Sequence, residues 1–247
     1  MRAFGKTDTG SVRPTNQDAY ILGQLSDTCL FAVVCDGMGG ANGGNVASAM
    51  AIQVISGRIA EGFREDMQDS SVYHMLESAI SAANIEIFDR AMAEPELRGM
   101  GTTVVAALIC GETAYIAHVG DSRAYLITPE QITQITRDHS IVQDMVEKGQ
   151  LTQSEARNHP RKHFITRALG VEDTVECDYT ELTIPEDSTL LICTDGLTNM
   201  IESDDIYNTV KSTGAQEAID CLIASANQAG GSDNITAMFV LCEEDHK

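Results

Sequence analysis

Residues 29–37 read CLFAVVCDG, a run of seven apolar residues that ends at an aspartate followed by a glycine. A membrane-spanning helix needs about 20 apolar residues, so this run is too short to cross a bilayer. A short apolar run bounded by turn residues is typical of a core strand. Residues 190–196, LLICTDG, repeat the pattern near the other end of the chain. The sequence therefore predicts buried strands that carry an Asp-Gly pair at their carboxyl ends.

Other apolar segments, separated by short polar turns, surround these two runs. We expect strands at residues 18–25, 29–35, 102–110, 113–119, 122–127, 131–135, 175–183, 188–194 and 235–242. Ser26-Asp27, Gly111-Glu112 and Gly120-Asp121 have the composition of hairpin turns. Because tight turns join most neighbouring strands, the sheets should be largely antiparallel.

Apolar residues at steps of three and four predict helices between these strands. We expect helices at residues 43–63, 70–93, 139–148, 203–211 and 214–229. Thr152 and Glu155 form a capping-box pattern that starts another short helix, which ends near His159-Pro160. Helices packed outside two antiparallel sheets would bury all of these apolar faces. We therefore expect an α+β layered sandwich that forms one domain over residues 1–247.

The acidic composition argues against several classes of partner. The chain has 37 Asp and Glu residues against 16 Lys and Arg residues, which gives a formal net charge of −21. Nucleic-acid backbones and anionic membranes attract basic surfaces, so we expect neither a nucleic-acid partner nor membrane insertion. The N-terminus lacks the apolar segment of a secretory signal, and we expect a cytoplasmic protein.

The seven cysteines are an odd number and include no Cys-x-x-Cys pair. Cys35, Cys110, Cys193 and Cys242 lie inside or at the ends of apolar runs. We expect them to be reduced thiols that pack as small hydrophobic side chains. No spacing of Cys and His residues resembles a zinc ligand set.

Four aspartates at the edges of predicted strands are candidate metal ligands. Asp36, Asp195, Asp121 and Asp233 each adjoin an apolar strand and have a glycine beside them or close by. Any one of them could simply form a turn. Together they could converge at one edge of the sheets, where crowded carboxylates repel one another unless a hard cation lies among them. Oxygen ligands select Mg²⁺ or Mn²⁺, two of which can activate a water and hold a phosphoryl oxygen, and Gly37 would let its carbonyl approach an ion.

Seven short motifs resemble those of the bacterial PPM (type 2C) metal-dependent serine/threonine protein phosphatases. They are Arg13-Pro14-Thr15-Asn16-Gln17-Asp18, Val34-Cys35-Asp36-Gly37-Met38-Gly39-Gly40, Gly101-Thr102-Thr103, Val119-Gly120-Asp121-Ser122-Arg123, Ile165-Thr166-Arg167-Ala168-Leu169-Gly170, Thr194-Asp195-Gly196-Leu197 and Ser232-Asp233-Asn234-Ile235-Thr236. They follow the family order and span residues 13 to 236, nearly the whole chain. Each motif alone is a weak signal, whereas all seven together are highly specific.

The resemblance implies a sandwich of two antiparallel sheets flanked by pairs of helices, with a centre of two Mn²⁺ or Mg²⁺ ions at one end. It implies that Asp36 bridges both ions and that the Gly37 carbonyl binds the second ion. Asp195 and Asp233 would complete the first ion, and Asp18 would lie in the shell around the centre.

The same resemblance suggests roles for two further residues and one segment. Arg13 corresponds to the arginine that binds the substrate phosphate, and a guanidinium suits this role because it can contact two phosphate oxygens. Asp121 lies in the motif that supplies a third, weaker metal site in bacterial members. The alternative is that Asp121 turns a hairpin and pairs with Arg123. Residues 138–163 resemble the helical flap that influences substrate choice.

The resemblance implies an enzyme that hydrolyses phosphoserine and phosphothreonine esters in proteins, as a monomer that opposes a bacterial serine/threonine kinase. Met38 stands where eukaryotic members have a histidine proposed to protonate the leaving group, so the general acid is left open. Two alternatives remain, a catalytically silent regulatory module and a phosphatase dedicated to an anti-sigma-antagonist-type regulator. The complete set of carboxylates disfavours the silent module, and a panel of phosphoproteins would test the dedicated phosphatase. The net charge of −21 disfavours a two-metal nuclease.

Overall fold

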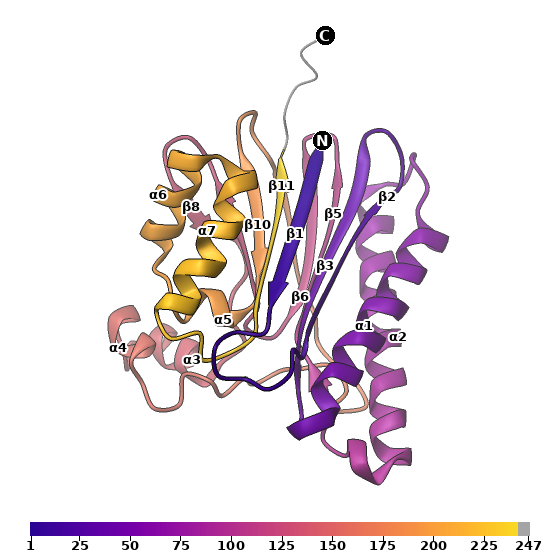
Figure 1. Ribbon diagram of the computed structural model, residues 1–247. Helices are drawn as coiled ribbons and strands as arrows, with labels where there is room; N and C mark the ends of the chain where they lie inside the picture. Colours follow the sequence, from indigo (N-terminus) through magenta and orange to yellow (C-terminus); the bar gives the residue numbers. More distant parts are fainter. Residues whose placement is uncertain (242–247) are drawn as a thin grey trace.

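The computed structural model of the protein describes residues 1–241, except for the side chains of residues 41 and 42. Two β-sheets stack face to face in the centre, and pairs of helices cover their outer faces (Figure 1). This layering confirms the predicted fold class. None of the helices in residues 1–241 is long and apolar enough to span a membrane.

Every neighbouring pair of strands is antiparallel, as expected from the tight turns. The first sheet has the order β1 (Arg2–Asp8), β11 (Ile235–Leu241), β10 (Thr189–Cys193), β7 (Arg123–Ile127) and β8 (Ile132–Gln134). The second sheet has the order β2 (Asp18–Gln24), β3 (Cys29–Met38), β5 (Val104–Cys110), β6 (Thr113–Val119) and β9 (Asp178–Thr183), with β4 (Gly101–Thr102) paired to β3.

Each sheet carries its own pair of helices. The second sheet packs against α1 (Gly40–Gly62) and α2 (Asp69–Ala93), and the first packs against α6 (Ser203–Thr213) and α7 (Ala215–Gln228). Two single turns, η1 (Pro95–Leu97) and α5 (Asp195–Thr198), follow α2 and β10. The short helices α3 (Ile141–Glu147) and α4 (Gln153–Arg157) lie below the sheets at the lower left in Figure 1. They lie within residues 138–163, the segment that we expect to be the flap, and α4 begins at the predicted capping box of Thr152 and Glu155.

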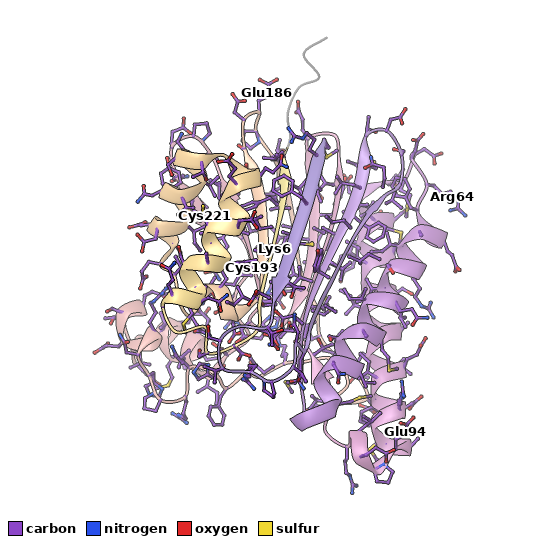
Figure 2. The ribbon with its side chains drawn as sticks, in the orientation of Figure 1. Lys6, Arg64, Glu94, Glu186, Cys193 and Cys221 are labelled. Atoms are coloured by element: carbon purple, nitrogen blue, oxygen red, sulfur yellow. A yellow bond between two sulfur atoms is a disulfide. The ribbon has the colours of Figure 1, made fainter. Side chains whose placement is uncertain are left out.

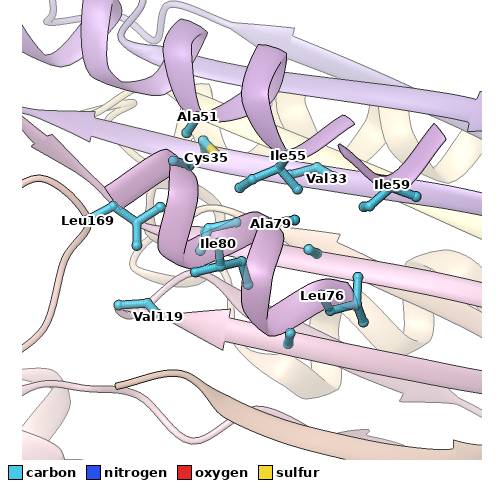
Figure 3. Close-up of a cluster of buried hydrophobic side chains, with 14 of the residues drawn as sticks. Val33, Cys35, Ala51, Ile55, Ile59, Leu76, Ala79, Ile80, Val119 and Leu169 are labelled. Carbon is cyan, nitrogen blue, oxygen red and sulfur yellow. The ribbon is translucent and has the colours of Figure 1, made fainter. Parts of the chain in front are cut away.

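The alternation of side chains along β3 explains how one apolar strand serves two cores. Val33 and Cys35 pack towards α1 and α2 in the outer core, which Figure 3 shows in close-up. Ala32 and Val34, one residue out of phase, pack in the core between the two sheets. Successive side chains of a strand point to opposite faces, so a continuous apolar run marks a strand buried on both sides.

Three features differ from the sequence prediction. Strand β1 was not expected, and it is an edge strand that pairs with β11 along its whole length. The single turn α5 was also not expected. Gly120-Asp121 is not a hairpin turn, because β6 lies in the second sheet and β7 in the first. The connection instead crosses from one sheet to the other, and this crossing brings Asp121 to the end of both sheets.

The prediction of reduced thiols is wrong for Cys110. Cys110 and Cys29 occupy directly paired positions of β5 and β3 and form a disulfide across the two strands. Cys35 and Cys193 are buried free thiols, as expected, whereas Cys221 on α7 is exposed (Figure 2). The prediction for Cys242 lies outside the described residues. Sequence spacing alone gives no sign of a bond between residues that are 81 positions apart.

Candidate metal centre

Asp36 lies near the end of β3, where a neighbouring segment fixes its backbone. Its N–H donates to the Thr103 hydroxyl at 3.0 Å, and its carbonyl accepts from the Thr103 N–H at 2.9 Å. The Thr102 hydroxyl also donates to this carbonyl, at 2.9 Å. Asp18 is the register partner of Asp36 on β2. The second sheet therefore contributes two of the predicted site residues as direct neighbours.

The first sheet meets this pair through two threonine hydroxyls. Thr194, after β10, donates to Asp18 Oδ2 at 2.9 Å, and Thr236 on β11 donates to the same oxygen at 2.6 Å. Thr194 directly precedes Asp195, which begins α5 and accepts from Asn199 Nδ2 at 2.8 Å. These hydrogen bonds join the two sheets at the edge where the carboxylates gather. Neither threonine was assigned a role from the sequence.

Asp233 and Arg13 form an ion pair, with Arg13 Nη2 2.7 Å from Asp233 Oδ2. The loop that carries Arg13 is tied to the start of β11 by Asn234, a residue to which the sequence assigned no role. The Asn234 amide donates to the Thr15 carbonyl at 3.0 Å and accepts from the Gln17 N–H at 2.8 Å. Asn234 is only 4% exposed, so these bonds satisfy its buried amide. The available sequence signal was the position of Asn234 within the motif at residues 232–236.

Asp121 joins the cluster from the connection between the sheets. It is 8% exposed and follows Gly120, which has a φ of 109°. A Cβ atom at Gly120 would lie 2.5 Å from Thr103 Cγ2, so glycine is required by both conformation and space. The expected alternative, a hairpin turn with an Asp121–Arg123 pair, is not what the structure contains. Arg123 instead donates to both carboxylate oxygens of Asp138.

The carboxylates of the cluster raise one another's pKa values. Burial is the largest cause for Asp18, and with nearby negative charges it raises the pKa of this carboxyl from 3.8 to about 7. Burial and the charges of Asp18 and Asp195 raise the pKa of Asp36 well above its ordinary value. The pKa values of Asp121 and Asp195 are raised for the same two reasons, burial first and neighbouring carboxylates second. A cation among these groups would relieve the repulsion.

Two buried oxygens in the cluster have no hydrogen-bond partner within the described residues, Oδ1 of Asp18 and Oδ1 of Asp195. Such oxygens are costly when buried, and a cation satisfies them. The candidate ligand atoms are carboxylate oxygens, which are ligands that Mg²⁺ and Mn²⁺ prefer. The residues present therefore fit a divalent metal ion of this type.

The structure shows a packing reason for Gly37 besides the one we expected. A Cβ atom at Gly37 would lie 2.1 Å from the Gly44 carbonyl oxygen of α1 and 2.6 Å from the Gln17 carbonyl oxygen. Helix α1 and the residue-17 loop thus approach β3 so closely that only glycine fits. Backbone packing alone therefore requires glycine at position 37, whether or not an ion binds there.

A cavity of about 860 Å³ opens beside the cluster. Its wall includes Arg13, Asp36, Asp121, Asp195 and Asp233 together with Met38 and His163. Asp18 does not line the cavity wall, although it is paired with Asp36 across β2 and β3. Apart from Asp18, all of the predicted site residues thus meet around one open space, since Gly37 also contributes to its wall.

The flap is fixed to the turn that carries Asp195. Arg157 of α4 donates to the Thr198 carbonyl at 3.2 Å, and its Nε atom lies 2.9 Å from a carboxylate oxygen of Glu202. At the other end, Arg137 pairs with Asp144 at 2.8 Å and with Glu147 in α3. The flap therefore has ionic contacts to the rest of the protein from both of its helices.

Comparisons with known proteins agree with this geometry. A family model described as protein phosphatase 2C matches residues 11–236. The serine/threonine phosphatase stp of Listeria innocua is 38% identical over 244 residues, which cover 97% of this chain and 95% of that protein. The crystal structure of the serine/threonine phosphatase Stp1 from Staphylococcus aureus is 33% identical with a TM-score of 0.92, covering 98% of this chain and 95% of the other.

A further similar structure is the catalytic domain of the phosphatase PstP in complex with two manganese ions. It is 32% identical with a TM-score of 0.82, and 96% of each chain is covered. The matched residues include the whole carboxylate cluster and every strand except β1 and most of β11. The chain therefore belongs to the protein phosphatase 2C family and is a metal-dependent phosphoprotein phosphatase.

Proposed function

We propose that the protein hydrolyses phosphoserine and phosphothreonine esters in proteins at a centre of two Mn²⁺ or Mg²⁺ ions. The observation that carries this proposal is the convergence of five aspartates at one end of the two sheets. Burial and mutual repulsion raise the pKa values of four of them, Asp18, Asp36, Asp121 and Asp195. Two divalent cations are the groups that would balance such a concentration of negative charge.

The proposed ligands follow the geometry and the family resemblance together. Asp36, the Gly37 carbonyl, Asp195 and Asp233 would hold the two ions. Asp18 would lie in the shell around them, where Thr194 and Thr236 orient its carboxylate. Asp121 and Asp195 would together hold a third ion at a weaker site. In support of this, burial and then the nearby charge of Asp195 raise the pKa of Asp121.

The chemistry supplied at this site by bound divalent ions is activation of a water and polarisation of the phosphoryl oxygens. Hydrolysis adds the water oxygen to phosphorus and breaks the ester P–O bond, and the serine or threonine oxygen leaves with a proton. Arg13 binds two phosphate oxygens with its guanidinium fork. To do so, Arg13 must give up its ion pair with Asp233 when the substrate binds. Met38 lines the cavity and has no proton to give, so it does not protonate the leaving oxygen.

The proposed substrates are phosphorylated proteins, and the proposed partner is a bacterial serine/threonine kinase whose products the enzyme dephosphorylates. The wide opening of the cavity supports access of a protein segment, since a cavity of about 860 Å³ exceeds what a phosphate group needs. We propose that residues 138–163 select among substrates from the rim and that the protein acts as a monomer in the cytoplasm.

Turnover of a phosphothreonine peptide and of a small aryl phosphate, with and without EDTA, tests this function. Asp36→Ala should lower turnover by orders of magnitude on both substrates, because it removes a ligand and its charge. The matched control is Asp27→Ala, since Asp27 is an exposed aspartate in the β2–β3 turn. Full activity of Asp36→Ala, or of the wild type after complete removal of metal ions, would contradict the proposal.

A further inference from the structure

The backbone of Gly120, the residue before Asp121, is held by a histidine from a distant part of the chain. Strand pairing ends at Val119, so Gly120 has no partner in the ladder of β5 and β6. The Gly120 N–H donates to Nδ1 of His139 at 3.0 Å. The Gly120 carbonyl accepts from the backbone N–H of His139 at 2.9 Å. One residue thus fixes both peptide planes that flank the Gly120 Cα atom.

These two bonds determine where the Asp121 carboxylate points. The Gly120 carbonyl and the Asp121 N–H belong to the same peptide plane, which is rigid. Fixing that plane restricts the backbone rotation that carries the Asp121 side chain. Gly120 lacks a Cβ and occupies φ 109°, a region with much conformational freedom for glycine, so without the histidine this turn would be poorly defined.

The imidazole of His139 is itself locked in one orientation. It is completely buried, and its ring stacks on His118 with centroids 4.8 Å apart and an interplanar angle of 17°. Since Nδ1 accepts a hydrogen bond, the ring proton is on Nε2, which lies 3.3 Å from Asp178 Oδ2. Arg167 donates to the other oxygen of Asp178 at 2.7 Å. The chain of contacts therefore sets both the tautomer and the direction of the Nδ1 lone pair.

The ligand atoms of His118, His139 and Asp178 lie within 4.8 Å of one another, which could also indicate a metal site. Two contacts argue against this interpretation. Arg167 Nη1 lies 2.7 Å from Asp178 Oδ1 and 3.3 Å from His139 Nε2, so a guanidinium already supplies the positive charge. His139 also uses its Nδ1 lone pair on the protein backbone. The group supports a backbone turn and has no open position for an ion.

We propose that His139 is a positioning residue, which holds the Gly120–Asp121 turn and so presents the Asp121 carboxylate for binding of the third divalent ion. This inference rests on the proposed function, in which Asp121 and Asp195 form the weakest of the metal sites. His139 touches neither the substrate nor the ions. It acts through two hydrogen bonds to Gly120.

The test compares three variants of His139. His139→Leu removes the acceptor and keeps an apolar side chain of similar size. His139→Asn offers an oxygen at the position of Nδ1, so it can still accept from the Gly120 N–H. His139→Gln carries its acceptor one bond farther out and replaces the Leu variant if that protein does not fold. His74→Leu serves as the control, because His74 is an exposed histidine on α2.

Two measurements do not depend on activity. Amide hydrogen exchange of Gly120 in EDTA-treated protein reports whether the two hydrogen bonds between His139 and Gly120 are intact. Mn²⁺ titration followed by electron paramagnetic resonance counts the bound ions. His139→Leu should accelerate Gly120 exchange and weaken the weakest class of Mn²⁺ sites by about tenfold, equivalent to about 1.4 kcal/mol. The tighter sites should be unchanged, and His139→Asn should restore both readouts to within about twofold.

The same titration in the Asp121→Ala background separates this inference from the proposed function. If Asp121→Ala removes the weak Mn²⁺ class and His139→Leu leaves it intact, the role of His139 is refuted while the third site stands. If Asp121→Ala leaves the titration unchanged, the third site itself is refuted, and the role of His139 with it. If His139→Leu adds a further loss to Asp121→Ala, the histidine does not act through Asp121, which also refutes the inference.

Discussion

The carboxylate of Asp18 should destabilise the protein when no metal ion is bound, and Asp18→Asn tests this. Asp18 is paired with Asp36 on the neighbouring strand, accepts two hydrogen bonds on Oδ2 and has no partner for its buried Oδ1 within residues 1–241. Asparagine removes the negative charge and keeps an oxygen that can accept from Thr194 and Thr236. We therefore expect the variant to be more stable than the wild type without metal ions.

The magnitude follows from the pKa of Asp18, which burial and neighbouring carboxylates raise from 3.8 to about 7 in the folded protein. Because one pKa unit corresponds to about 1.4 kcal/mol, this difference costs the wild type about 4 kcal/mol above pH 7. The asparagine N–H₂ group replaces Oδ1, and an unmet buried donor costs about 1–3 kcal/mol. The expected net gain in the free energy of unfolding is therefore about 1–3 kcal/mol.

The gain must depend on pH in one direction. A carboxyl with a raised pKa binds its proton more tightly in the folded state than in the unfolded state. The wild type therefore loses stability as the pH rises from about 4 to about 7, which is the window between the two pKa values. The variant lacks that loss. Below about pH 3.8, where Asp18 is mostly protonated in both states, the advantage of asparagine should disappear.

Urea unfolding, followed by circular dichroism between pH 4 and pH 8 in EDTA, measures this difference. Asp27→Asn, in the exposed β2–β3 turn, is the matched control and should give no gain. Added Mn²⁺ should stabilise the wild type more than the variant, since the ion needs the charge that asparagine lacks. A gain that is equal at pH 4 and pH 8 would refute the reasoning, as would a wild type that is most stable at pH 8 in EDTA.

Three further predictions concern residues other than Asp18. Arg13→Ala should raise KM and lower kcat on peptide and aryl phosphate alike, with partial rescue by lysine; unchanged kinetics would exclude Arg13 from phosphate binding. Arg161→Ala in the flap should alter phosphoprotein turnover more than aryl phosphate turnover, and equal losses would contradict a role in substrate choice. Cys110→Ser should lower the free energy of unfolding by about 2–4 kcal/mol under oxidising conditions only, and an equal loss in dithiothreitol would argue against the disulfide.

The layered fold could be predicted because its signals are local. An apolar run such as residues 29–35 identifies a strand that is buried on both faces, and Figure 3 shows two of its side chains, Val33 and Cys35, in the outer core. Helical periodicity located α1 and α2 to within a few residues of their ends. Strand β1 was missed because its glycine and its charged residues dilute the alternation of an edge strand.

The sheet to which each strand belongs was harder to predict than the strand itself. A glycine followed by an aspartate suits a hairpin and also suits a crossing between sheets. At Gly111 the chain turns back within the second sheet, whereas at Gly120 it passes to the first. The difference is set by contacts far along the chain, including the bonds from His139 to Gly120. No local pattern contains that information.

The residues of the candidate site were predicted mainly from motif resemblance. The residues that hold them in place were not predicted. Asp36, Asp195 and Asp233 stand out because an acid at the end of an apolar strand is conspicuous. Thr194 and Asn234 do not stand out, since threonine and asparagine at strand ends are common. Their importance is a property of burial and partners, which the folded structure alone supplies.

The carboxylate cluster also helps to join the two sheets at one end. Thr194 and Thr236 reach from the first sheet to Asp18 in the second, so part of the contact between the layers consists of hydrogen bonds to a carboxylate. These bonds favour the charged form of Asp18, while burial and the charges of Asp195 and Asp233 oppose it. Without a cation, the opposition dominates and weakens the fold at this edge. With cations bound, the same charges become attractive contacts between the layers, and metal binding should therefore stabilise the protein as well as support its chemistry.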